Sequence, residues 1–262
     1  MKIGFVSDIH EDIKALRMAL AALKKRGCRK IVCLGDSVGY SVPYYGYLWS
    51  RDAAAVLETL RKECDVVVAG NHDLFAARKI PVNKAGFPYP KNWYALDFAQ
   101  RKSRAKGKIW LYEDNELASL LSAKDTRYLA GLPEFAVADF GGVRIFLSHY
   151  AYPDLTGSKA IEHKTCDDVG AHFRFMKRHK CALAISGHDH KEGMMLFSGV
   201  SAKDVTFGKT KLDRASPTWL HIPAVARGSF ANGVAIFDTE TYEIETVPLG
   251  SPKHVPPEWR KE

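Results

Sequence analysis

The chain has 262 residues, of which 46% are hydrophobic and 26% are charged, and its formal net charge is +8. This composition is that of an ordinary globular protein, and no run of about 18 apolar residues occurs, so we expect no membrane-spanning segment. The basic excess favours anionic partners, which leaves phosphate-bearing small molecules, nucleic acid and anionic surfaces open.

The cysteines and the first residues exclude two further classes of protein. Five cysteines, an odd number without a C-x-x-C pair, indicate neither a disulfide framework nor a cysteine zinc site. The sequence begins with a strand-like run and shows no secretory signal pattern, so we expect a cytoplasmic protein. Nothing in the sequence predicts the oligomeric state.

Five apolar runs rich in Val and Ile predict strands that are buried on both faces. These runs are KIGFV (2–6), KIVCL (30–34), DVVVA (65–69), VRIFL (143–147) and CALAI (181–185). Helical patterns separate several of them, at residues 11–27, 52–63 and 166–180. The β-α-β-α-β alternation of the first 70 residues indicates parallel strands joined by right-handed crossovers.

The later part of the chain is richer in strands. Residues 134–149 predict a hairpin that turns at Gly141 and Gly142, and residues 233–249 predict another. Residues 74–134 interrupt this rhythm with an irregular loop over 79–94 and a helix-like stretch over 95–108. We therefore predict one domain over residues 1–262, with two sheets packed face to face and an insertion at about 74–134 that covers the active-site end.

Polar side chains that can bind metals follow all five apolar runs. They are Asp8, His10, Asp36, Asn71, His149, His188 and His190. Ligands bind at the carboxyl ends of strands in open α/β sheets, so we expect these side chains along one edge. Oxygen and imidazole donors without a thiolate suit manganese, iron, zinc or similar ions. Seven donors suit two cations with a shared carboxylate, which would clamp a phosphoryl group and lower the pKa of a bound water.

Five motifs in this order resemble those of the calcineurin-like metallophosphoesterases: Asp8-x-His10, Gly35-Asp36, Gly70-Asn71-His72-Asp73, His149 and Gly187-His188-x-His190. They span residues 8 to 190, most of the chain. The resemblance implies a four-layer α/β/β/α sandwich of two mixed sheets flanked by helices. It also implies two divalent cations (manganese, iron, zinc or nickel) and hydrolysis of phosphate esters by a metal-activated hydroxide.

The resemblance further implies a role for each motif residue. Asp8, His10 and His190 would bind the first cation, Asn71, His149 and His188 the second, and Asp36 would bridge both. His72 would protonate the leaving-group oxygen, and Asp73 would orient its ring. This role fits the chemistry, because an alkoxide leaving group needs an acid and histidine can supply a proton near neutral pH.

One motif departs from a branch of the family. The stretch GDSVGYSVPYY (35–45) lacks the second Asp and the Arg that follow the bridging Asp in protein Ser/Thr phosphatases and diadenosine tetraphosphate hydrolases. It is more similar to the phosphodiesterase-like bacterial and archaeal members. We therefore predict a phosphodiesterase. One alternative is a phosphomonoesterase or nucleotide phosphatase of the same fold. Another is a non-catalytic metal-binding scaffold, but the presence of His72 and of every ligand position argues against it.

Three weaker features leave alternatives open. The aromatic stretch from Tyr40 to Trp49 could stack a nucleobase, although packing onto the aromatic residues of the insertion is favoured. The basic stretch 101–108 predicts a solvated helix face, then guidance of an anionic substrate, with nucleic-acid binding a distant third. Arg227 could contact phosphate, but an ordinary surface arginine is the favoured interpretation.

Overall fold

A computed structural model describes residues 1–160, 169–199 and 201–255 of the chain. Two six-stranded sheets and a small third one make up its strands. In spatial order the first sheet holds β11 (Gly208–Lys211), β14 (Glu243–Pro248), β13 (Gly233–Asp238), β1 (Lys2–Val6), β2 (Lys30–Cys33) and β4 (Val66–Val67). The second holds β10 (Ser201–Val205), β9 (Met194–Ser198), β12 (Thr218–His221), β8 (Leu183–Ser186), β7 (Val143–Ser148) and β6 (Phe135–Phe140). The third pairs β3 (Tyr40–Ser41) with β5 (Glu116–Leu117).

Both large sheets are mixed, as expected. β1 pairs in parallel with β2, and β2 with β4, while β13 and β14 form an antiparallel hairpin. In the second sheet β8 pairs in parallel with β7 and β12, while β6 and β7 form the predicted hairpin. The third predicted strand is shorter than its apolar run: β4 is a half-buried edge strand of two residues, because Ala69 N leaves the sheet to donate to Pro133 O at 2.8 Å.

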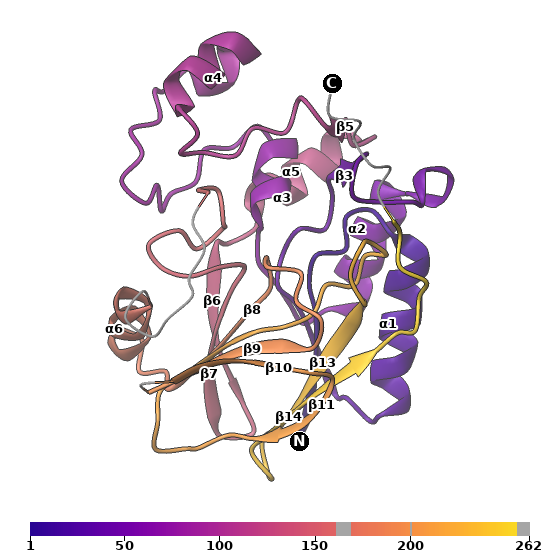
Figure 1. Ribbon diagram of the computed structural model, residues 1–262, viewed down its shortest axis with the longest axis vertical. Helices are drawn as coiled ribbons and strands as arrows, with labels where there is room; N and C mark the ends of the chain where they lie inside the picture. Colours follow the sequence, from indigo (N-terminus) through magenta and orange to yellow (C-terminus); the bar gives the residue numbers. More distant parts are fainter. Residues whose placement is uncertain (161–168, 200, 256–262) are drawn as a thin grey trace.

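The described helices are α1 (Ile13–Lys25), α2 (Ala53–Glu63), α3 (Asn71–Ala76), α4 (Phe98–Ala105), α5 (Ala123–Gly131) and α6 (Gly170–Arg178), with short 3-10 turns η1 (Leu48–Ser50) and η2 (Trp93–Ala95). Helices on the outer faces of the two large sheets give the four layers, whereas α3, α4 and α5 lie beyond the ends of the strands, at the top of the view (Figure 1). α1 and α2 pack on the first sheet, and α6 packs on the second. The start of the predicted helix 166–180, with Cys166, lies outside the described residues. No described helix is long and apolar enough to cross a membrane.

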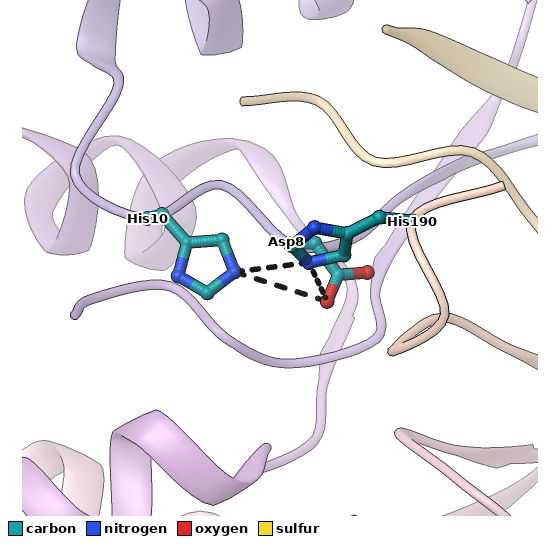
Figure 2. Close-up of side chains that lie close together, drawn as sticks. All are labelled: Asp8, His10 and His190. Atoms are coloured by element: carbon teal, nitrogen blue, oxygen red, sulfur yellow. Dashed lines mark hydrogen bonds and ion pairs between the residues drawn. The ribbon is translucent and has the colours of Figure 1, made fainter. Parts of the chain in front are cut away.

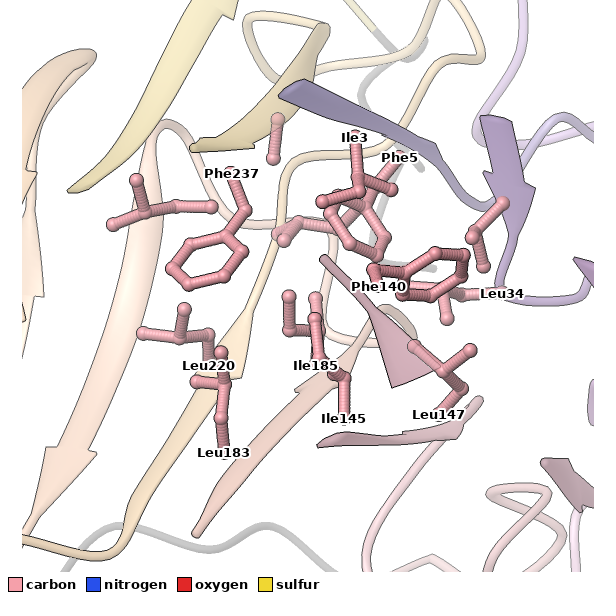
Figure 3. Close-up of a cluster of buried hydrophobic side chains, with 14 of the residues drawn as sticks. Ile3, Phe5, Leu34, Phe140, Ile145, Leu147, Leu183, Ile185, Leu220 and Phe237 are labelled. Carbon is pink, nitrogen blue, oxygen red and sulfur yellow. The ribbon is translucent and has the colours of Figure 1, made fainter. Parts of the chain in front are cut away.

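The main core lies between the two sheets (Figure 3). Ile3 and Phe5 of β1 face this core, together with Ile145 of β7 and Ile185 of β8, and all four are fully buried. Burial of one such side chain contributes on the order of 1.5–3 kcal/mol. This core holds the two sheets in a fixed relation, so that the loops at their carboxyl ends meet.

The segment 74–134 supplies α4, β5 and α5. β5 pairs with β3 in the register Tyr40 with Leu117 and Ser41 with Glu116, which ties this segment to the loop after Asp36. Its interpretation as an insertion within a single domain stays a prediction.

Candidate metal centre and cleft

The candidate metal ligands come from both large sheets. Asp8 and His10 follow β1, Asp36 follows β2, and Asn71 opens α3 directly after β4. From the second sheet, His149 follows β7, and His188 and His190 follow β8. The structure therefore brings the ends of the five predicted strands together at one place.

The first group consists of Asp8, His10 and His190 (Figure 2). His190 Nε2 lies 3.2 Å from Asp8 Oδ1 and 3.3 Å from His10 Nε2. His10 Nε2 lies 4.0 Å from Asp8 Oδ1. Asp8 and His10 are almost fully buried, whereas the His190 side chain is 24% exposed. Three donor atoms thus converge on one point that can be reached from outside.

The second group consists of Asp36, His149 and His188. His149 Nε2 lies 3.0 Å from Asp36 Oδ2 and 3.2 Å from His188 Nδ1. Asn71 is also buried, and its Nδ2 donates to Tyr112 OH at 2.7 Å. The side-chain oxygen of Asn71, Oδ1, has no hydrogen-bond partner and is therefore available to bind a cation.

Asp36 lies between the two groups. Its Oδ2 is 3.0 Å from His149 Nε2 and 4.0 Å from His10 Nε2, while its Oδ1 accepts from the His72 backbone N at 2.9 Å. Burial would raise the pKa of Asp36, but the nearby His149 and His72 outweigh it, so the pKa lies below its usual range. An ionised carboxylate between two clusters of imidazoles has the position that a bridging ligand needs.

Two properties of the described residues fit divalent cations. Asp8 Oδ1 and Asn71 Oδ1 are buried without a hydrogen-bond partner, which is costly unless another group contacts them. His10 Nδ1 and His149 Nδ1 each lie 2.8 Å from a backbone carbonyl oxygen, of Gly39 and Leu34 respectively. Donation to these carbonyls fixes the tautomer and leaves Nε2 free, as in metal-binding histidines generally. None of the described cysteines belongs to the candidate groups.

The backbone around the ligands is strained. Positive φ angles occur at five of them: Asp8 (53°), His10 (47°), Asp36 (51°), His188 (75°) and His190 (49°). Non-glycine residues in this region cost of order 1–3 kcal/mol each and cluster at functional sites. The residue before the two histidines, Gly187, has no room for a side chain, because a Cβ there would collide with Ser7 Oγ and lie 2.5 Å from Asp8 Oδ2.

His72 lies beside the candidate ligands, and its ring is held by a residue that the sequence did not indicate. His72 Nδ1 lies 2.6 Å from Glu116 Oε2, whose side chain is only 3% exposed. Burial would lower the pKa of His72, but the Glu116 and Asp36 carboxylates outweigh it and raise this pKa to about 9. The remaining ring nitrogen, Nε2, lies 3.9 Å from Asp36 Oδ2 and so faces the two candidate groups; with His10 and Asp36, His72 forms a third set of side chains close enough to hold a cation.

The expectation that Asp73 orients the His72 ring is wrong. Asp73 Oδ1 accepts from the backbone N of Ser37 at 2.9 Å and of Val38 at 3.3 Å, and Oδ2 accepts from Gly70 N at 3.0 Å. Adjacent residues of a helix point in different directions, so Asp73 turns away from its neighbour. Its role is to hold the loop after Asp36 against the start of α3.

A second buried pair anchors the loop that carries His188 and His190. Asp189 Oδ2 lies 2.5 Å from His221 Nδ1, and His221 is fully buried on β12. Burial would raise the pKa of Asp189, but His221 outweighs it and lowers this pKa to about 2. The aspartate between the two histidines therefore fastens their loop to the sheet.

A cleft of about 450 Å³ opens onto the candidate metal ligands. Aromatic side chains form much of its wall: Tyr44, Tyr45, Trp110, Tyr112 and Phe230. Ser41, Asn115 and Ser229 add hydroxyl and amide groups. Among the described residues that line it, none is a lysine or an arginine. The cleft is thus aromatic and polar, although the whole chain is basic.

The aromatic stretch 40–49 divides between packing and the cleft. Tyr40, Tyr45 and Tyr47 are buried against one another, and their other apolar neighbours are Ala226, Leu117 and Phe230. The aromatic residues of segment 74–134 that were expected to receive them form a separate cluster around Trp93. Tyr44 is 53% exposed and lines the cleft, whereas Trp49 is 97% exposed and is not part of its wall.

The two candidate basic features have structural partners. Arg227 binds Asp12 through Nε (2.7 Å to Oδ2) and Nη2 (2.8 Å to Oδ1), at the residue that caps α1. It is therefore a paired, half-buried arginine rather than a free one at the surface, and it is not among the residues that line the cleft described above. On α4, Arg101 is buried and pairs with Glu113, while most other basic residues of 101–108 are exposed, as expected for a solvated helix face.

Comparison with known proteins identifies relatives of this chain. The calcineurin-like phosphoesterase superfamily domain matches residues 1–207. An uncharacterised protein of Methanocaldococcus jannaschii is 38% identical over 71 residues, and the match spans about a quarter of either chain (27% of this one and 26% of that one). A metallophosphoesterase structure from Sphaerobacter thermophilus has a TM-score of 0.64 at 18% identity, covering 96% of this chain and 89% of its own. A hypothetical protein from Pyrococcus horikoshii has a TM-score of 0.58 at 17% identity, covering 94% and 87%.

Proposed function

Because the chain belongs to the calcineurin-like phosphoesterase superfamily and is a metal-dependent phosphoric ester hydrolase, we propose that it cleaves phosphodiesters at a centre of two divalent cations. Asp8, His10 and His190 hold one cation; Asn71, His149 and His188 hold the other, with Asp36 shared. The imidazole, carboxylate and amide donors suit manganese, iron, zinc or nickel. When bound, the cations supply Lewis-acid stabilisation of the phosphoryl oxygens and a water of lowered pKa.

The residues of the chain supply the proton for the leaving group. His72 Nε2 faces the metal groups, and His72 Nδ1 is held by Glu116. The protonated ring donates its Nε2 proton to the departing oxygen as the bond between this oxygen and phosphorus breaks. Positioned acids of this kind contribute typically 10²–10⁴-fold to the rate.

The residues that line the cleft favour a phosphodiester over a phosphomonoester as the substrate. A dianionic monoester or a polyphosphate nucleotide is usually bound by arginine or lysine, and none of the described lining residues is either. A diester has one negative charge and needs less such help. Exposed Tyr44 and Trp110 offer flat apolar surfaces for the second organic group on phosphorus. We propose a small-molecule or nucleotide diester as substrate, and we retain the cytoplasm as the predicted location.

The test compares matched substrates on protein of measured metal content. We expect kcat/KM for a bis-nitrophenyl diester to exceed that for nitrophenyl phosphate, and metal analysis to give about two divalent cations per chain. A preference for the monoester of tenfold or more would assign the phosphomonoesterase alternative instead. A preparation that never exceeds one cation per chain, and that gains no activity with added manganese, would refute the dinuclear centre.

The variant His72→Ala tests whether His72 acts as the acid rather than as a metal ligand. His72→Ala should keep its metal and lose turnover, with a larger loss for alkyl esters than for nitrophenyl esters, because nitrophenolate leaves without a proton. Equal losses on the two kinds of ester would show that His72 binds the phosphoryl group rather than acting as an acid.

A further inference from the structure

We propose that Glu116 is the positioning residue of the acid, and that it supplies from segment 74–134 the carboxylate that the chain lacks after Asp36. This inference rests on the proposed function, because it assigns the reaction role of Glu116 through His72. The stretch that follows Asp36 reads SVGY and holds no carboxylate, and Asp73 is bonded to backbone groups. Among the described side chains, Glu116 is the one that hydrogen-bonds the His72 ring.

The contact is built into the fold. Glu116 lies on β5, where it pairs with Ser41 of β3, and its backbone N donates to Tyr112 O at 2.8 Å. Its side chain is nearly fully buried, so the 2.6 Å contact with His72 Nδ1 is shielded from water. A charge-assisted hydrogen bond in such surroundings is shorter and stronger than one between neutral groups.

Other groups restrict the ring to this orientation. The Tyr112 ring lies 4.4 Å from the His72 ring between centroids, and the His10 ring lies 4.8 Å away, edge to face. A Cβ on Gly39 would lie 2.6 Å from His72 Nδ1, so the backbone of the loop closes a further side. With Nδ1 bound to Glu116, Nε2 is the nitrogen that faces the metal groups.

The protons balance with water as the one further reactant. In the acid form both ring nitrogens carry a proton, and the Nδ1–H group donates a hydrogen bond to the Glu116 carboxylate. The attacking oxygen comes from a water that has lost one proton to solvent; as it bonds to phosphorus, the bond from phosphorus to the leaving oxygen breaks, and its electron pair stays on the leaving oxygen, which takes the Nε2 proton. The ring becomes neutral, and the Nδ1–H to Glu116 bond is kept, so the ring does not rotate during the reaction.

The test uses Glu116→Ala and Glu116→Gln in the full-length, metal-loaded protein, with Asp114→Asn as the matched control. Asp114 is an exposed acid two residues before β5, and it pairs with Lys102 rather than with the site. Removing a group that orients a metal-binding histidine costs typically 10–100-fold in affinity or activity, and we take the same range for the carboxylate that orients His72. We expect Glu116→Ala to lower kcat on an alkyl diester by this amount. KM and metal content should not change, the loss on a nitrophenyl diester should be smaller, and Glu116→Gln, which can still accept from Nδ1–H, should lie between. Asp114→Asn should match the wild type.

Two further measurements separate positioning from a general structural effect. Residues that act as a unit are non-additive, so His72→Ala with Glu116→Ala should be no slower than His72→Ala alone. Independent of activity, NMR of ¹⁵N-histidine-labelled protein should show a protected, downfield His72 Nδ1–H proton that Glu116→Ala removes and Asp114→Asn retains.

The outcomes distinguish this inference from the proposed function. If the wild type hydrolyses no phosphodiester while the Nδ1–H signal still depends on Glu116, the proposed function fails and the contact itself stands. If the wild type is active and His72→Ala is impaired, but Glu116→Ala equals the wild type, the positioning role is overturned. Additive losses in the double variant, or loss of metal from Glu116→Ala, would overturn it as well.

Discussion

Replacing Gly39 by alanine perturbs the His72 ring without changing any candidate ligand. Gly39 has a φ of +94°, and a Cβ there would lie 2.6 Å from His72 Nδ1 and 2.8 Å from His72 Cβ. Ordinary van der Waals contact with a Cβ begins at 3.4 Å, so the ring has to retreat by about 0.8 Å, the difference between 3.4 and 2.6 Å. The atom displaced most directly is the one that binds Glu116.

The expected effects of Gly39→Ala on rate and on stability follow from this displacement and from the backbone conformation. Misplacement of a reacting group by about 1 Å lowers rates by roughly 10²-fold. The left-handed backbone adds strain of about 1–2 kcal/mol for a residue with a side chain. For a chain of this length, each kcal/mol lowers the Tm by about 2–4 °C. We therefore expect Gly39→Ala to fold with a slightly lower Tm, to keep its metal and to lose about 10²-fold in kcat on an alkyl diester.

Gly86→Ala is the matched control, because Gly86 has a φ of +79° and no heavy atom lies within 4 Å of a Cβ there. It carries the same kind of backbone strain without touching His72. The assay measures kcat on the alkyl diester, with Tm by calorimetry and metal content by elemental analysis. The reasoning is refuted if folded Gly39→Ala stays within threefold of the wild type, or if Gly86→Ala loses as much activity.

Three further predictions follow from the site. Asp36→Ala should lower the occupancy of both cations in elemental analysis, because it removes the shared ligand; loss of a single cation would place Asp36 in one group alone. In chelator, the raised pKa values of His72 (about 9) and His149 (about 10) predict that these two residues make a contribution to stability that is full below pH 6.5 and declines as pH rises through 9 to 10. Thermal unfolding between pH 6 and 10 measures this decline, and His72→Ala should reduce it. Tyr44→Ala should raise KM for an aryl diester by several-fold, whereas Trp49→Ala, outside the cleft, should leave KM unchanged. If the two variants have the same KM, the aromatic side chains of the cleft do not bind the substrate.

The fold and the grouping of the candidate ligands could be predicted because their signals are local. Buried strands appear as continuous apolar runs, and the carboxyl ends of parallel strands meet at one edge of a sheet. Asp8, Asp36 and His149 therefore needed only their position after a strand to be placed together. The exact extent of β4 could not be obtained in this way, because an edge strand ends where a distant carbonyl, here Pro133 O, takes over its hydrogen bonds.

The partner of His72 could not be predicted because its signal is not local. Glu116 is 44 residues further along the chain, in a part of segment 74–134 for which the sequence predicted neither a helix nor a strand. Asp73 was the obvious candidate by adjacency, yet the helix turns it toward the backbone of Ser37. Arg227 shows the same limit, since its partner Asp12 is 215 residues away. Such pairs depend on how loops from different elements dock, which a pattern in one stretch does not encode.

Candidate ligands from the two large sheets contact one another and so connect the sheets at their carboxyl ends. His190 and His188 belong to one sheet and contact Asp8 of the other, through 3.2 Å between Nε2 and Oδ1 and 3.0 Å between the His188 backbone N and Oδ2. His149 reaches Asp36 across the same boundary at 3.0 Å. A cation held here would add bonds between the two sheets, which are otherwise joined by their apolar core and by hydrogen bonds such as the one between His149 Nδ1 and Leu34 O. Its removal would loosen the carboxyl ends of β2 and β8 together, so their amide protons should exchange in step, although these strands are never neighbours in a sheet.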